Sequence, residues 1–210
     1  MKPKAFVVSV EGMDGVGKST HASLLRQAIA KSGMTCEMRK LPMYDWPSGK
    51  LLKRMLETGA AVAWPVLFQF FQVLDKLLFQ WFVLPFLSRR VDFVVLDRWH
   101  VSSWAYGSAT DVPGWINRLF IKPLMHPDVT LVFQGTCKRA SARDAYEADM
   151  GIQKRVKFYY TFWLGSGLKS AMNSQAVDAD GELSTVHVKV VNAVNQALIR
   201  RGKDEIQVLR

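Results

Sequence analysis

The chain of 210 residues is 49% hydrophobic, which is enough for one substantial core and favours one domain over two. Its formal net charge of +10 favours anionic partners such as nucleotides, nucleic acids or an acidic membrane surface, without choosing among them. Cys36 and Cys137 are far apart and lack metal-ligand spacing, which argues against a disulfide framework or a zinc site and fits a reducing, cytoplasmic compartment.

Short β-branched or aromatic runs alternate along the chain with longer stretches of helical periodicity. Strands are expected at 5–10, 35–40, 91–97 and 129–134, with a weaker fifth at 175–178. Helices are expected at about 18–32, 48–58, 64–88, 114–125, 138–171 and 183–201, and a loop from Gly107 to Gly114. This alternation predicts a three-layer α/β fold with a central parallel sheet of about five strands, built as one domain over residues 1–210.

The segment from Ala61 to Leu87 is the most apolar part of the chain. Asp75 and Lys76 interrupt it, and Pro65 and Pro85 bracket it. Because a charged pair in the middle of a bilayer would cost several kcal/mol, we expect a buried or dimer-forming helix here and no membrane partner.

The first predicted strand leads directly into the run G-M-D-G-V-G-K-S. Its glycines permit backbone conformations in which successive amides converge on phosphate oxygens at the start of the next helix. Lys18 adds a mobile positive charge for the β- and γ-phosphates, and the Ser19 hydroxyl is placed to ligate Mg²⁺. The expected ATP-binding residues are Gly12, Met13, Asp14, Gly15, Val16, Gly17, Lys18, Ser19 and Thr20. The motif indicates a P-loop NTPase fold with ATP and Mg²⁺ as cofactors, but leaves the acceptor open.

A second functional position follows the third predicted strand, in V-V-L-D-R-W-H at 94–100. Asp97 and Arg98 stand at the carboxyl end of that strand, the edge where open α/β sheets bind ligands. A strand-capping salt bridge is the structural alternative, because such ion pairs are common.

Four segments together resemble the thymidylate kinase family of nucleoside monophosphate kinases. The loop Gly12–Thr20 resembles the family's G-x-D/E-G-x-G-K-S/T, and Asp97-Arg98-Trp99 resembles its D-R-Y/H element. The run S-S-W-A-Y-G from Ser102 to Gly107 resembles S-x-x-A-Y-x-G, and H-P-D-V-T-L-V-F at 126–133 resembles the strand P-D-L-T-L-x-L. Weaker echoes occur at 41–42, 48–52, 67–68 and 177–181, so the resemblance spans nearly the whole chain.

The resemblance implies roles for individual residues. Asp14 would bind the 3′-hydroxyl of a deoxynucleotide, Arg98 would hold the acceptor phosphate, and Asp97 would help to organise Mg²⁺ and water. Phe68 would stack on the base and Tyr106 would pack against the sugar. The substrate-binding residues expected on this basis are Asp14, Phe68, Gln72, Arg98, Ser102 and Tyr106. Each has a core-packing alternative, which is strongest for Phe68 in its long apolar helix.

The resemblance also implies a mobile lid at about 136–150. Family members with glycine at the position of Gly15 usually carry the arginine that stabilises the transferred phosphoryl group in that lid. Arg139 and Arg143, beside Lys138, are the candidates here and join Lys18, Asp97 and Arg98 as the expected catalytic residues. A solvated basic helix face is the alternative reading.

The sequence departs from the family at two positions near the acceptor phosphate. Tyr44 and Gln72 stand where the family usually has arginines. Their loss would weaken recognition of a free monophosphate dianion, although Lys40, Lys50 or Lys53 could compensate from the same region.

The expected function is ATP-dependent phosphoryl transfer to a deoxynucleoside monophosphate, with thymidylate as the first candidate. The two departures keep open a relative that phosphorylates the hydroxyl of a hydroxymethyl pyrimidine in DNA, for which the charge of +10 would help to hold the polyanion. A non-catalytic nucleotide-binding module is the alternative of another class. The apolar 61–87 segment, with the resemblance, suggests a homodimer.

Overall fold

The computed structural model describes residues 5–136, 145–166 and 173–209. Its five strands form one parallel sheet in the order β2-β3-β1-β4-β5, which confirms the predicted sheet. The strands are β1 (Phe6–Gly12), β2 (Cys36–Lys40), β3 (Phe93–Asp97), β4 (Val129–Gln134) and β5 (Ser174–Asp178). In register, Val8 of β1 is paired with Val95 of β3 and Val129 of β4.

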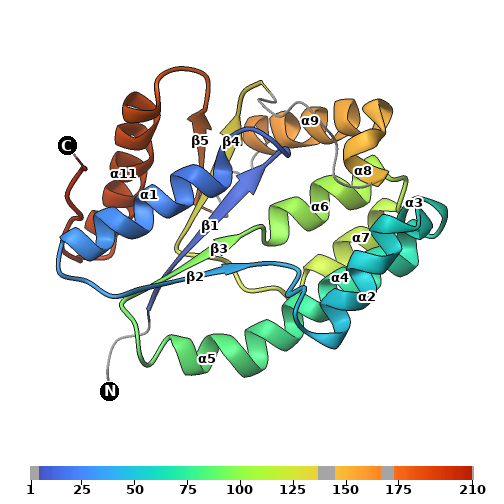
Figure 1. Ribbon diagram of the computed structural model, residues 1–210, viewed down its shortest axis with the longest axis horizontal. Helices are drawn as coiled ribbons and strands as arrows, with labels where there is room; N and C mark the ends of the chain where they lie inside the picture. The colour runs from blue at the N-terminus through green and yellow to red at the C-terminus, as the bar shows by residue number, and fades with distance from the viewer. Residues whose placement is uncertain (1–4, 137–144, 167–172, 210) are drawn as a thin grey trace.

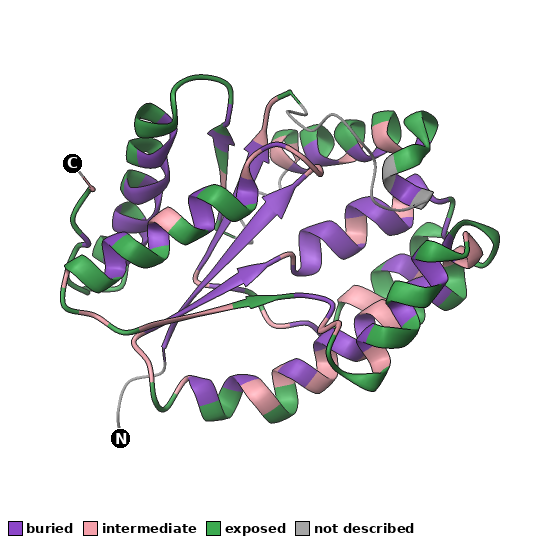
Figure 2. Ribbon diagram, in the orientation of Figure 1, coloured by how far each residue is buried: buried purple, intermediate pink, exposed green. Residues whose placement is uncertain are grey.

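Helices pack on both faces of the sheet and complete three layers (Figure 1). Alternate residues of β1 point to opposite faces, so Val8 packs with helices α1 (Lys18–Lys31) and α11 (Leu183–Arg200), whereas Val7 packs on the other side. That other side carries α6 (His100–Ala109) and α9 (Met150–Gly165), among other helices. Figure 2 shows the central strands buried between helices whose outer faces are exposed.

The second side also carries the helices that flank the nucleotide-sized cavity described below. They are α2 (Pro47–Glu57), α3 (Ala60–Ala63), α4 (Pro65–Leu78), α5 (Leu84–Leu87), α7 (Gly114–Ile121) and α8 (Ala145–Ala148). A π-helical turn, η1 (Phe79–Val83), connects α4 to α5. The expected helix at 64–88 is therefore present, with a widened turn at its centre.

Two predicted boundaries differ from the structure. The expected loop at 107–114 begins three residues later, because 107–109 form the last turn of α6, an element that the sequence did not predict. Gly107 suits this turn because a Cβ there would lie 2.7 Å from the side-chain oxygen of Asn117, so glycine lets α7 pack closely.

The single helix expected at 138–171 is also wrong within the described residues. Two helices, α8 and α9, occupy that part of the chain, and residues 137–144 and 167–172 lie outside the description. The break falls at Asp149, whose carboxylate accepts a hydrogen bond of 2.9 Å from the backbone N–H of Ile152. A carboxylate in this N-cap position starts a new helix.

The continuous helical stretch Pro65–Leu87 is long and apolar enough, by length and composition, to cross a membrane. Its central charges are bonded inside the protein. Asp75 accepts hydrogen bonds from the Met43 backbone N–H at 2.9 Å and from the Ser48 hydroxyl at 2.6 Å, and the Lys76 ammonium donates to the Trp99 carbonyl oxygen at 2.8 Å. These contacts identify α4 as a packed helix of the domain, as expected.

Candidate active site

The glycine-rich loop joins the end of β1 to the start of α1. Gly12 has a φ of 136°, and a Cβ there would lie 2.5 Å from the carbonyl oxygen of Phe133 on β4. Gly17, at the cap of α1, has a φ of 89°. Both positions require glycine, and the resulting turn presents backbone amides at the N-terminus of a 14-residue helix, where anions bind favourably.

Lys18 opens α1 and turns back over the loop. Its ammonium donates a hydrogen bond to the carbonyl oxygen of Met13, and the side chain is buried. Burial and the nearby Arg98 lower the pKa of Lys18 to about 7, against the opposing effect of Asp14 and Asp97. A phosphate would supply the negative charge that this ammonium needs.

Ser19 and Asp97 meet at the carboxyl edge of the sheet. The Ser19 hydroxyl donates to one carboxylate oxygen of Asp97 at 3.2 Å, and the other oxygen of Asp97 is buried with no hydrogen-bond partner in the described part of the chain. A hydroxyl beside an unpartnered carboxylate oxygen fits Mg²⁺, which prefers oxygen ligands and takes few of them from protein. These two residues would hold the ion together with phosphate oxygens and water.

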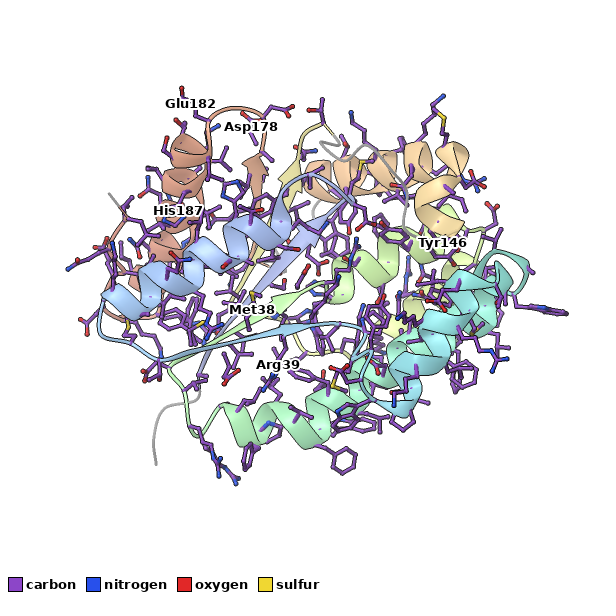
Figure 3. All side chains as sticks on the ribbon, viewed as in Figure 1. Met38, Arg39, Tyr146, Asp178, Glu182 and His187 are labelled. Atoms are coloured by element: carbon purple, nitrogen blue, oxygen red, sulfur yellow. The ribbon has the colours of Figure 1, made fainter. Side chains whose placement is uncertain are left out.

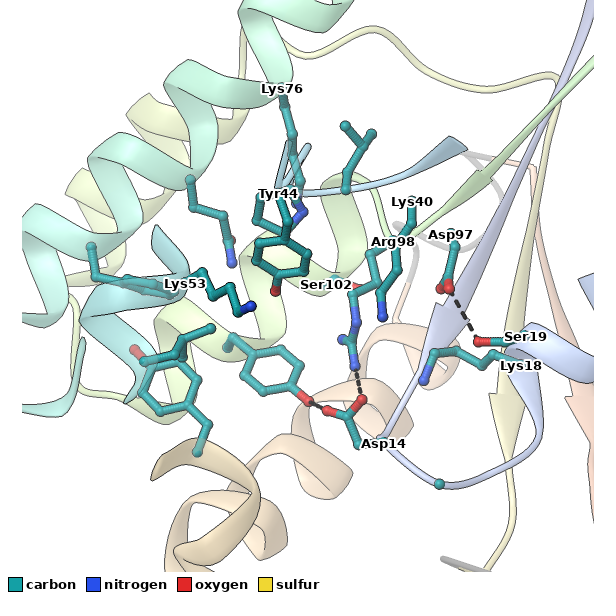
Figure 4. Close-up of a pocket in the computed structure, with 18 of the residues that line it drawn as sticks. Asp14, Lys18, Ser19, Lys40, Tyr44, Lys53, Lys76, Asp97, Arg98 and Ser102 are labelled. Atoms are coloured by element: carbon teal, nitrogen blue, oxygen red, sulfur yellow. Dashed lines mark hydrogen bonds and ion pairs between the residues drawn. The ribbon is translucent and has the colours of Figure 1, made fainter. Parts of the chain in front are cut away.

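Asp14, Arg98 and Tyr106 form a bonded group on the other side of the loop (Figure 4). One Asp14 oxygen pairs with the Arg98 guanidinium, and the other accepts a hydrogen bond of 2.7 Å from the Tyr106 hydroxyl. Burial alone would raise the pKa of the Asp14 carboxyl, but Arg98, Lys18 and Tyr106 outweigh it and hold the pKa below its ordinary value. Asp14 is therefore an anion at neutral pH.

Arg98 reaches this group through an unusual backbone conformation. Its φ is 73°, in the left-handed region, and its backbone N–H donates to the Val10 carbonyl oxygen at 3.0 Å. Non-glycine residues adopt this region infrequently, and when they do so the surrounding structure must stabilise it. The sharp turn at the end of β3 directs the guanidinium back toward the loop.

A cavity of about 750 Å³ connects the two groups. Figure 4 shows side chains from the loop, from the end of β3 and from α4 converging on it. The sequence-predicted residues that line it are Asp14, Gly15, Gly17, Lys18, Ser19, Thr20, Phe68, Gln72, Asp97, Arg98, Ser102 and Tyr106. Gly12, Met13 and Val16 lie outside its lining, and Val16 is buried in the core behind the loop.

Three aromatic rings form one wall of the cavity. Phe68 meets Tyr146 edge to face with ring centroids 5.3 Å apart, and Tyr146 stacks on Tyr106 at 5.8 Å. Figure 3 labels Tyr146 on α8, close to α6 and far from Asp178 and Glu182 at the other end of the sheet. The sequence gave no signal for Tyr146, which stands in the segment expected to be lid.

Ser102 lines the cavity, but its hydroxyl is already engaged. It donates to the Glu11 carboxylate and lies 2.8 Å from the Tyr160 hydroxyl. Glu11 also accepts backbone N–H bonds from Trp99, Val101 and Ser102 at 2.9–3.3 Å. Burial raises the pKa of Glu11, whereas Lys76 and these bonds oppose the rise.

Glu11 thus anchors the start of α6 and the turn that carries Arg98. Sequence reasoning missed this residue. The available signal was an acidic residue within the otherwise apolar first strand, V-V-S-V-E-G, where a buried carboxylate must have partners.

The two departures from the family pattern also face the cavity. Tyr44 and Gln72 line it together with Lys40 and Lys53, whereas Lys50 lies outside the lining. Lys76, which sequence reasoning did not place in the site, lines it as well. Arg139 and Arg143, with Lys138, lie outside the described residues, so the arginine lid stays a prediction.

Comparison with known proteins agrees with this geometry. The family model described as thymidylate kinase matches residues 10–187. The thymidylate kinase of Bordetella pertussis is 28% identical over 129 residues, and the match spans 61% of each chain. The probable thymidylate kinase of Thermococcus gammatolerans is 28% identical over 213 residues, covering 92% of this chain and 97% of its own.

The fold resembles a solved structure over almost its full length. The structure of thymidylate kinase from Candida albicans superimposes with a TM-score of 0.72 and 19% identity, and the match covers 99% of both chains. This likeness supports the α/β P-loop fold, and the family model covers most of the sequence. The chain belongs to the thymidylate kinase family.

Proposed function

We propose that the protein is a nucleoside monophosphate kinase that transfers the γ-phosphate of Mg-ATP to a deoxynucleoside monophosphate, with thymidylate as the first candidate. One observation carries the proposal. A single cavity is lined both by the phosphate-binding residues Lys18 and Ser19 and by the bonded group of Asp14, Arg98 and Tyr106. Donor and acceptor phosphates would therefore meet in one site, and positioning of this kind is the main catalytic requirement of phosphoryl transfer.

On the donor side, the loop amides and the Lys18 ammonium would bind the β- and γ-phosphates. Ser19 and Asp97 would hold Mg²⁺, which supplies charge neutralisation between phosphate oxygens when it is bound. Burial strengthens the interaction of Lys18 with phosphate, because little water competes for its charge.

On the acceptor side, Arg98 would hold the acceptor phosphate, and Asp14 would bind the 3′-hydroxyl while orienting Arg98. Phe68 would stack on the base, and Tyr106 would pack against the sugar. An acceptor phosphate is already a competent nucleophile, so this reaction requires no general base. Arg139 or Arg143, from a lid at about 136–150, would stabilise charge on the transferred phosphoryl group.

The residues at positions 44 and 72 favour a second candidate. Tyr44 and Gln72 present neutral side chains to the cavity where the resemblance leads us to expect arginines. An acceptor without a terminal phosphate, such as a hydroxymethyl pyrimidine in DNA, would not need those charges, and Asp97 or Asp14 would then have to accept the hydroxyl proton. The third candidate is a binding module without turnover.

We also propose that the protein acts as a homodimer in the cytoplasm. Large aromatic side chains are exposed on the outer side of α4, η1, α5 and α7, among them Trp64, Phe70, Trp81, Phe82 and Trp115. A second copy of the chain would remove this apolar surface from water. The free thiol of Cys36 is compatible with a reducing compartment.

The deciding experiment is transfer of radiolabelled γ-phosphate from ATP to a panel of free deoxynucleoside monophosphates and, in parallel, to DNA that contains normal or hydroxymethylated pyrimidines. Labelling of a free monophosphate, lost in Lys18→Ala, supports the proposal. Labelling of DNA alone would replace it with the base-hydroxyl kinase. Binding of ATP without labelling of either acceptor would leave the non-catalytic module.

A further inference from the structure

Three side chains of α4 line the cavity in a row. Phe68, Gln72 and Lys76 are spaced four residues apart, so they lie on one face of the helix one turn after another. This face presents an aromatic ring, then an amide, then an ammonium group. The proposed function places the acceptor base on Phe68, and the next two side chains therefore stand beside the polar edge of that base.

Lys76 is buried to 1% exposure and extends from α4 into the group of side chains that line the cavity (Figure 4). Its ammonium donates to the Trp99 carbonyl oxygen at 2.8 Å and to the Ser103 hydroxyl oxygen at 2.5 Å. An ammonium has three N–H donors, so these two bonds fix its position and leave one donor for a ligand.

The charges around Lys76 keep it available as a cation. Glu11 faces it from β1, Arg98 from the turn after β3, and Asp75 precedes it on α4. Burial lowers the pKa of Lys76 to about 8, and Glu11 opposes the change. A lysine is therefore held in charged form near neutral pH within the cavity wall.

Gln72 supplies the opposite kind of group. Its side-chain oxygen is buried and has no hydrogen-bond partner within residues 5–136, 145–166 and 173–209. Leaving a buried acceptor unpaired is unfavourable, so this oxygen is suited to a donor that arrives with the ligand.

We propose that Gln72 and Lys76 together read the base of the acceptor nucleotide. With the base stacked on Phe68, the Gln72 oxygen accepts a hydrogen bond from a ring N–H, and Lys76 donates to the neighbouring carbonyl oxygen. This inference rests on the proposed function and extends it to base selection. An arginine at position 72 could only donate, whereas this pair offers one acceptor and one donor.

The pair matches one class of base. Thymine and uracil present a ring N–H beside a carbonyl oxygen, which complements an acceptor beside a donor. Cytosine presents an unprotonated ring nitrogen and an amino group at the same positions, so both contacts would be mismatched. The site would therefore favour keto pyrimidines, because unpaired buried polar groups discriminate strongly between substrates.

The test is kcat/KM for dTMP, dUMP and dCMP, measured for the wild type, Lys76→Met and Gln72→Met. We expect the wild type to favour dTMP and dUMP over dCMP, and each variant to lose about 10–100-fold on those two substrates while dCMP changes little. Lys122→Met, an exposed lysine outside the cavity lining, is the control and should match the wild type.

The selectivity ratio separates base reading from damage to the fold. Equal losses on all three nucleotides, or an unchanged ratio in both variants, would overturn the inference. A wild type that phosphorylates dCMP as well as dTMP would overturn it and leave the proposed kinase standing, whereas a wild type that phosphorylates no free nucleotide would remove both. If Lys76→Met does not fold, the ratio for Gln72→Met decides, because Gln72 is less deeply buried than Lys76.

Discussion

The Arg98 guanidinium and the Asp14 carboxylate form an ion pair that joins the turn after β3 to the phosphate-binding loop. Arg98 is 15% exposed and Asp14 is 25% exposed, so water screens the pair only in part. The Tyr106 hydroxyl fixes the second oxygen of Asp14. The position of the acceptor-side cation is thus set by the donor-side loop.

Replacing Arg98 with glutamine should impair use of the acceptor far more than binding of ATP. We expect kcat/KM for the acceptor to fall by about 100–1,000-fold, the order seen when a preorganised group that stabilises charge is removed. Steady-state kinetics with each substrate varied in turn measures the effect. Arg155→Gln is the matched control, because Arg155 is half exposed and pairs with Asp111 at 3.5 Å. Equal losses for ATP and for the acceptor would contradict the assignment.

Lys18→Ala should remove most of the phosphoryl transfer. The buried ammonium would stabilise charge on the transferred group, so we expect kcat to fall by at least about 100-fold. Lys31→Ala changes an exposed lysine at the other end of α1 and should leave kcat unaltered. A Lys18 variant with near-normal kcat would argue against the loop as the donor site.

Glu11→Gln should destabilise the fold. The glutamine amide would place an N–H₂ group where Glu11 now accepts bonds from three backbone N–H groups and the Ser102 hydroxyl. We expect the free energy of unfolding to fall by about 1–3 kcal/mol, the usual cost of unpaired buried donors. Urea denaturation measures it, with the exposed Glu57→Gln as the control. An unchanged denaturation midpoint would show that α6 does not depend on Glu11.

The buried Lys76 should give stability a specific pH dependence. Its pKa is about 8 in the folded protein against an ordinary value of 10.5, so between these pH values the unfolded chain binds more protons. The free energy of unfolding of the wild type should therefore rise from pH 8 to pH 10.5 relative to Lys76→Met, by at most about 3 kcal/mol. Glu11, Arg98 and Asp75 remain in both proteins.

Urea denaturation of both proteins at several pH values across this window tests the effect. The comparison cancels the titration of exposed lysines, which both proteins share. A constant difference between the two proteins from pH 8 to pH 10.5 would mean that Lys76 ionises in the folded state much as it does in the unfolded chain.

The sequence predicted the central sheet and the two motifs at its carboxyl edge because their signals are local. The phosphate loop depends on glycines at fixed spacing, and Asp97 and Arg98 directly follow an apolar strand. Once the strands are parallel and adjacent, their ends must meet. No long-range information was needed for either inference.

The parts that sequence reasoning missed depend on contacts between distant residues. Helix α6 is rich in serine and glycine, and its first turn depends on Glu11, about 90 positions earlier. Lys76 reads as a simple interruption of an apolar helix until Trp99 and Ser103 are seen around it. Tyr146 enters the cavity wall only because α8 folds against α3 and α2.

Asp75 has a consequence for protein engineering. Its carboxylate bonds both the loop that follows β2, through Met43, and the start of α2, through Ser48. The loop carrying Tyr44 and the helix carrying Gln72 are therefore one mechanical unit, although about thirty residues separate them in the chain. A chimera that imports the arginine-bearing loop of a relative without its matching α4 would leave Asp75 buried without a donor, so the two segments must be exchanged together.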